Sequence, residues 1–210
     1  EDGGHVVMRE TIDPHGNEKL VMYPENTFNR KFSTQTVQES DGKKITEVSY
    51  SKKWLNWTGR REYDGLCFSP GKTPPKGFYN LWRGFKVKPL AYEDADMFQR
   101  AGFDAFIAHA RDNVCKGDGP LFQWLMGYFA QMIQKPYERP LTTLVFQGKK
   151  GTGKNTLVDR IGFLLKDHYK VAADSRYLTS NFNGHLDNCL MLVLDEAFWS
   201  GDKSAEGKLK

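Results

Sequence analysis

The sequence predicts an α/β protein built around a parallel sheet, and two stretches carry that prediction. The first is a glycine-rich segment, residues 148–156, between the apolar run 141–146 and a second apolar run at 157–165. The second is the nearly continuous apolar run 189–194, which ends in two acidic residues. Such a run is typical of a central strand in a parallel sheet covered on both faces. We therefore expect strands and helices to alternate in this part of the chain.

The glycine-rich segment has the order strand, loop, helix that a phosphate-binding loop requires. Gly148, Gly153 and Lys154 match the spacing G-x-x-x-x-G-K. Glycines bring backbone N–H groups close to phosphates, the following helix directs its positive end at them, and the lysine adds a full charge. A plain glycine-rich turn between two core elements is the alternative. The residues expected to hold a nucleotide are Gly148, Lys149, Lys150, Gly151, Thr152, Gly153, Lys154, Asn155 and Thr156.

Two acidic residues, Asp195 and Glu196, follow the apolar strand 189–194 and supply the second half of the predicted site. An acid at the carboxyl end of a neighbouring strand can hold the magnesium ion that phosphoryl transfer needs. We assign Asp195 to magnesium, Glu196 to polarising the attacking water, and Lys154 to the phosphates, as the catalytic residues. The loop's own magnesium ligand stays open between Asn155 and Thr156, because Asn155 stands where Ser or Thr is usual. The adjacent Asp and Glu favour hydrolysis over transfer to a small acceptor.

Composition excludes several other classes of protein. Hydrophobic residues make up 39% and charged residues 27%, as in ordinary globular proteins. No apolar stretch is long enough to span a bilayer and no signal-peptide pattern opens the chain, so we expect no membrane association and a cytoplasmic location. The three cysteines are far apart without a C-x-x-C pair, which argues against a disulfide framework or a thiolate zinc site. His109 falls in a helical pattern and is interpreted as a packed side chain.

Positive charge is concentrated in residues 52–88, which hold nine Lys or Arg and two acidic residues. Aromatic side chains interleave with these cations, a pattern that suits phosphates and stacked bases. The alternative is that the aromatics form a small core and the cations solvate its surface. The candidate nucleic-acid contacts are Lys52, Lys53, Arg60 and Arg61.

Residues 1–90 predict a small, mixed accessory region that could contact DNA. Residues 5–23 have the pattern of a hairpin around a turn cluster, and residues 45–50 alternate like a strand after an Asp-Gly turn. Trp54, Leu55 and Trp57 indicate a short helix, and residues 85–87 a short strand before Pro89.

The rest of the chain predicts two further parts. Residues 91–140 form a helical segment, with one helix over 93–115 and another from Pro120 to Gln134. Residues 141–210 form the amino-terminal part of a P-loop ATPase core, with a further strand near residues 169–172.

Three stretches of the predicted ATPase core resemble one family. Residues 148–156, 177–183 and 194–203 together resemble the superfamily 3 helicase domain of phage and viral primase–helicases, in its phage primase–polymerase form. The helical pair at 93–134 is similar to the segment before that domain, and the resemblance extends from about Trp54 to the end. Two shorter stretches, residues 60–65 and 79–84, resemble the region just upstream.

The resemblance implies an ATP- and Mg²⁺-dependent motor that unwinds DNA, with single-stranded or forked DNA as partner. It also implies a homo-hexamer with nucleotide between subunits, an arginine finger from the neighbour and, for a phage protein, location in the host cytoplasm. The family's sensor strand, DNA hairpin and arginine finger would all lie beyond Lys210.

The chain therefore reads as a piece of a longer protein with an incomplete P-loop NTPase (AAA+-like) parallel sheet core. Without the sensor strand two apolar strands would have unpaired edges, so we expect residues 1–210 alone to be poorly soluble or inactive in ATP hydrolysis. Two other functions stay open: a P-loop kinase, and a nucleotide-gated DNA-binding or packaging ATPase that does not unwind strands.

Overall fold

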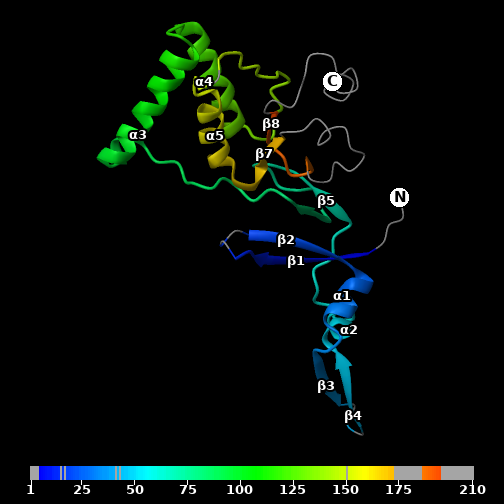
Figure 1. Ribbon diagram of the computed structural model, residues 1–210. Helices are drawn as coiled ribbons and strands as arrows, with labels where there is room; N and C mark the ends of the chain where they lie inside the picture. Colours follow the sequence, from blue (N-terminus) through cyan, green and yellow to red (C-terminus); the bar gives the residue numbers. More distant parts are fainter. Residues whose placement is uncertain are drawn as a thin grey trace. The chain divides into compact units, whose positions relative to one another are not determined.

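The computed structural model describes residues 5–14, 16, 18–40, 42, 44–149, 151–172 and 186–194. The chain divides into two compact units, Glu1–Glu62 and Tyr63–Lys210. Figure 1 shows the elements of each unit. The three-part division expected from the sequence stays a prediction. Across the described residues, none of the helices combines the length and apolar character needed to cross a membrane.

The first unit consists of two antiparallel hairpins and two short helices. Strand β1 (Val6–Ile12) pairs with β2 (Glu18–Pro24), which confirms the predicted hairpin. Strand β3 (Thr36–Ser40) pairs in the same way with β4 (Ile45–Ser49), which confirms the strand predicted at 45–50 over residues 45–49. The helices are α1 (Glu25–Lys31) and α2 (Tyr50–Leu55).

Aromatic side chains form the small core of this first unit. Phe28 is buried, and its ring lies 5.0 Å from that of Phe32 and 5.5 Å from that of Trp54. These distances are typical of favourable aromatic pairs, so Trp54 belongs to a core. The interpretation of the aromatics as core residues is correct for this side chain.

The second unit begins with a short parallel pair, β5 (Gly65–Cys67) and β6 (Phe78–Asn80). The Asn80 side chain accepts hydrogen bonds from the Ser69 and Trp82 amides and donates to the Ser69 carbonyl, each at 3.0 Å. The strand predicted at 85–87 is wrong. The Lys86 N–H donates instead to the carbonyl of Leu164 at 2.9 Å, so this backbone is bonded to a helix rather than to a strand.

Both predicted helices of the central segment are confirmed. A 3₁₀ turn, η1 (Tyr92–Asp94), precedes α3 (Met97–Ala108), and α3 continues into a π-helix, η2 (His109–Val114). Asp96 begins α3 with a capping box to Gln99. Asp118 caps α4 (Gly119–Gln134) by accepting from the Leu121 amide at 2.9 Å, and Pro120 stands in its first turn.

The core of the second unit lies where η2, α4 and α5 (Lys154–Leu165) meet. A 3₁₀ turn, η3 (Lys166–His168), then leads into β7 (Tyr169–Ala172), which pairs in parallel with β8 (Met191–Leu194) beside α5 (Figure 1). The strands predicted near 169–172 and 189–194 are therefore confirmed. The buried core residues are Ala110, Cys115, Leu125, Phe129, Met132, Leu157, Ile161 and Leu165.

The strand predicted over the apolar run 141–146, before the glycine loop, is absent from the described residues. Leu144 and Phe146 pack against the core, whereas Val145 between them is 85% exposed, so the segment alternates its two faces as a strand would. A strand also needs a neighbour for its N–H and C=O groups, and no described strand pairs with this one. Because β7 and β8 are joined only to each other among the described residues, the larger parallel sheet stays a prediction.

Candidate nucleotide-binding site

Two glycines with positive φ shape the loop before α5. Gly151 has φ +82° and Gly153 has φ +77°, a left-handed conformation that costs glycine little. Gly153 is also the N-cap of α5, where no side chain caps the helix. The first-turn N–H groups of a helix have no intrahelical partner, and together with the helix dipole they favour a bound anion. The local backbone therefore has the features that favour an anion, and a bound anion stays a prediction.

Lys154 closes this loop on itself. Its Nζ donates to the carbonyls of Gly148 and Lys149, at 3.0 and 2.8 Å, and lies 3.3 Å from the Thr152 hydroxyl. That hydroxyl donates in turn to the Lys149 carbonyl at 2.9 Å. The fold therefore places the lysine ammonium within the loop, beside the start of α5. These bonds bring Lys154 together with Gly148, Lys149 and Thr152, and Gly153 directly precedes it. Their role in binding a nucleotide stays a prediction.

The remaining predicted residues fall into two groups. Asn155 and Thr156 lie exposed in the first turn of α5, next to Lys154. Lys150, Asp195 and Glu196 lie outside the described residues, as does the resembling stretch 177–183, so their part of the site stays a prediction. Strand β8, which ends at Leu194 directly before the acidic pair, is described and lies parallel to β7. Within the described ranges no cluster of three or more His, Cys, Asp or Glu suits a metal ion.

A histidine that sequence reasoning treated as a packing residue contacts the loop. The His109 Nε2 atom lies 3.0 Å from the Gly153 carbonyl oxygen, and its Nδ1 lies 3.0 Å from the Asn113 amide. The only sequence signal was the spacing of four between His109 and Asn113, which places them on one face of a helix. That spacing does not indicate that the glycine loop is the partner of His109.

A second histidine fixes the approach to β8. His168 is fully buried, its Nε2 accepts from the Arg83 amide at 2.9 Å, and its Nδ1–H donates to the Asn188 carbonyl at 2.8 Å. Its ring stacks on Trp82 with centroids 4.4 Å apart. Burial lowers the pKa of His168 below its usual value, so the ring is held neutral. The Leu190 N–H donates to the His168 carbonyl at 2.8 Å, immediately before β8.

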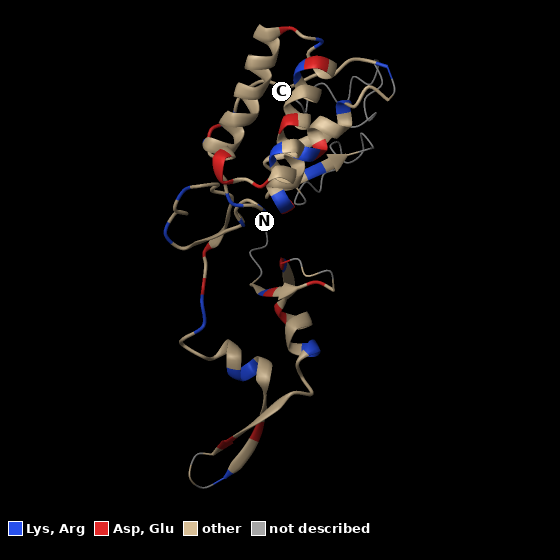
Figure 2. Ribbon diagram, turned by 90° about the vertical axis from the view of Figure 1, so that its left-hand side faces the viewer, with Lys and Arg blue, Asp and Glu red and all other residues tan. Residues whose placement is uncertain are grey.

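Three of the four candidate nucleic-acid cations are engaged within the first unit. Lys53 pairs with Glu39 at 3.2 Å. Arg60 pairs with Glu62 and also donates to the Leu55 carbonyl, and Arg61 pairs with Glu10 at 3.3 Å. Lys52 is exposed on α2. Charges of both signs are interspersed along the ribbon of this unit (Figure 2), so the cations do not stand apart from the acids.

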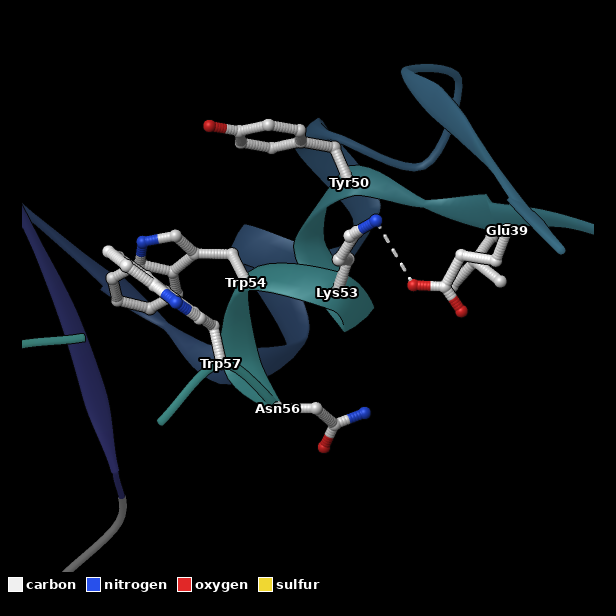
Figure 3. Close-up of a pocket in the computed structure, with 7 residues that line it drawn as sticks. Glu39, Tyr50, Lys53, Trp54, Asn56 and Trp57 are labelled. Carbon is white, nitrogen blue, oxygen red and sulfur yellow. Dashed lines mark ion pairs between the residues drawn. The ribbon is translucent and has the colours of Figure 1, made fainter. Parts of the chain in front are cut away.

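The first unit also holds an open cavity of about 520 Å³ on one side of α2 (Figure 3). Tyr50 and Trp57 are 47% and 56% exposed, and the Lys53–Glu39 ion pair is part of the lining (Figure 3). Aromatic faces beside a lysine are able to accept a flat ring such as a base. The lining residues are Glu39, Val48, Tyr50, Lys53, Trp54, Asn56 and Trp57.

Comparison with known proteins gives two partial matches. A family of unknown function (DUF5906) matches residues 146–210, which include the glycine loop, α5 and the acidic pair. The DNA primase-polymerase of Nitratiruptor phage NrS-1 is 32% identical over 93 residues. That match covers 44% of this chain and 12% of the phage protein, so the chain spans a small part of the relative's length. No solved structure matches the chain.

Proposed function

We propose that the chain is the ATP-binding and ATP-hydrolysing part of a phage-type replicative DNA helicase, of the kind joined to a primase. The observation that carries the proposal is the loop geometry, with the Lys154 ammonium held beside the uncapped start of α5. The partial likeness to a phage DNA primase-polymerase supports a role in DNA replication. A nucleotide phosphate is the anion that this motif serves.

The hydrogen-bond donors of the loop fit a nucleoside triphosphate. The Lys154 ammonium, the Thr152 hydroxyl and the first-turn amides of α5 are all groups that donate to phosphate oxygens. Asp195, with Asn155 or Thr156, would hold Mg²⁺, and Glu196 would orient the attacking water. When bound, the magnesium ion offsets negative charge on the phosphates. In this proposal the loop residues bind the phosphates. Glu196 orients the attacking water and accepts its proton.

DNA is the proposed partner, single-stranded or forked, and the proposed assembly is a homo-hexamer with nucleotide between subunits. The aromatic cavity beside α2 supports a base-stacking contact, with Lys52 and Lys53 near phosphates. Lys53, Arg60 and Arg61 would each join only by exchanging the acidic partner that they have in this unit. A charge reversal of Lys52 and Lys53 in the full-length protein should weaken DNA binding and flatten its dependence on salt.

Nucleotide binding by the full-length protein tests the proposal directly. Lys154→Ala should weaken binding of Mg-ATP at least tenfold, because it removes a full charge and a donor from the loop. Lys135→Ala is the matched control, since Lys135 follows α4 and pairs with Glu138 at 3.6 Å. Equal affinity in Lys154→Ala and the unaltered chain would rule out the phosphate-binding loop.

Hydrolysis and unwinding separate the proposal from the other two functions. In the full-length protein, Glu196→Gln should keep Mg-ATP binding but lose hydrolysis, because the amide accepts a proton poorly. Strand displacement on a forked duplex should require both Lys154 and Glu196. Phosphorylation of a small acceptor without DNA stimulation would favour a kinase, and DNA-stimulated hydrolysis without strand separation a packaging-type ATPase.

A further inference from the structure

We infer that His109 is a positioning residue for the phosphate-binding loop, held in orientation by Asn113. This inference rests on the proposed function, and it adds a link between the helical segment before the ATPase core and the nucleotide itself. The link crosses 44 residues of sequence, from the start of the π-helix η2 to the N-cap of α5.

The hydrogen-bond partners decide which nitrogen of His109 carries the proton. The Gly153 carbonyl is only an acceptor, so the Nε2 atom 3.0 Å away must donate. In the neutral imidazole the Nδ1 atom is then an acceptor, and it faces the Asn113 side-chain amide at 3.0 Å. Asn113 thereby selects the tautomer that donates to the loop, much as a neighbouring group orients a catalytic histidine.

The bond to His109 sets the direction of the next amide. In a trans peptide unit the C=O and the N–H point in opposite directions, and the peptide between Gly153 and Lys154 is trans. Holding the Gly153 carbonyl toward His109 therefore directs the Lys154 N–H away from it, to the side where an anion would accept a bond. The Leu157 N–H reaches the same carbonyl at 3.3 Å, so the 3.0 Å bond from His109 is the shorter of the two.

Packing gives an independent reason for the contact. A Cβ added to Gly153 would lie 2.3 Å from His109 Cε1 and 2.7 Å from its Nε2. The imidazole thus fills the space beside Gly153. The loop is both packed against the ring and hydrogen-bonded to it. The π-helix also fits this reading, because such wide turns occur frequently at functional sites.

Binding of Mg-ADP to the full-length protein, followed with a fluorescent methylanthraniloyl analogue, measures the effect. His109→Leu should raise the dissociation constant about tenfold, which corresponds to one net hydrogen bond. His109→Gln, whose amide can donate from a similar position, should stay within about threefold of the unaltered chain. Asn113→Ala should fall between them. Asp112→Ala, in the same π-helix but paired with Arg111 on the surface, is the control and should bind normally.

Hydrogen exchange without nucleotide tests the same contact independently of binding. In His109→Leu the amide of Leu157, which donates to the same Gly153 carbonyl, should exchange about tenfold faster, whereas the amides of α4 should not change. Melting temperatures of the unliganded variants check that the fold is kept.

The outcomes are distinguishable from failure of the proposed function. If Lys154→Ala binds Mg-ADP as well as the unaltered chain does, the proposed function fails, and hydrogen exchange alone then decides the role of His109. Normal affinity and normal exchange in His109→Leu would overturn the inference. So would equal losses of affinity in His109→Gln and His109→Leu accompanied by equal losses of melting temperature, because that pattern indicates only a structural role.

Discussion

Replacing His168 should destabilise the second unit more than other single changes outside its apolar core. His168→Ala leaves the Arg83 N–H and the Asn188 carbonyl without their partner, and each such loss costs about 1 kcal/mol or more. The ring also stacks on Trp82 at 4.4 Å, so its removal opens a cavity worth about 1–2 kcal/mol. We expect a total of about 3–4 kcal/mol, or roughly 10 °C in melting temperature for a unit of this size.

His168 should also make the stability of the second unit depend on pH. Burial lowers the pKa of His168 in the folded chain. As the pH falls to about 6.5, the unfolded chain therefore binds a proton that the folded chain does not bind. Stability from His168 is therefore full above about pH 6.5 and falls as pH falls below it, by at most about 1.4 kcal/mol per pH unit. Protonated Nε2 would also face the Arg83 N–H, donor against donor.

Urea unfolding followed by tryptophan fluorescence, at pH 7.5 and pH 5.5, measures both effects. His168→Gln should lose about 1–2 kcal/mol, since its amide can still donate and accept, and it should lack the histidine component of the pH dependence. His5→Ala is the control, because His5 is exposed in the first unit and such changes stay within about 0.5 kcal/mol. A loss below about 1 kcal/mol in His168→Ala, or an unchanged pH dependence in His168→Gln, would refute the reasoning.

Two further predictions concern glycine packing and thiol reactivity. Gly162→Ala should destabilise by about 1–3 kcal/mol although alanine favours helices, because the added Cβ would lie 2.5 Å from the Tyr169 ring. At Gly102 in α3 an added Cβ would have open space, so Gly102→Ala should stabilise by about 0.5–1 kcal/mol in the same urea unfolding assay. The same sign for both changes would contradict the structure. Burial raises the pKa of Cys189 to about 11, so its thiolate fraction at pH 8 is about 10⁻³ and iodoacetamide should label it about a hundredfold more slowly than a model thiol. Labelling at the rate of a free thiol would show that half-buried Cys189 is more exposed in solution than in the structure.

Local chemistry in the sequence determined most of the secondary structure and half of the candidate site. The first hairpin follows from turn residues between two predicted strands, and α3 and α4 begin at the capping residues Asp96 and Asp118. The second hairpin was predicted only in its strand β4, since β3 was not expected. The glycine loop is equally local, since Gly153 sets the backbone and Lys154 reaches back only 6 residues to Gly148. Interactions of this range are readable from spacing. The acidic pair that would complete the site stays a prediction.

Only the tertiary structure decided the contacts between segments that are distant in sequence. Residues 141–147 alternate like a strand, yet strand formation depends on a partner backbone that local pattern does not contain. Lys53 and Arg61 were expected to face nucleic acid, and both have acidic partners in the first unit. Folding brings His168 to Arg83 across 85 residues and His109 to Gly153 across 44, and these pairings depend on how helices pack, which no spacing encodes.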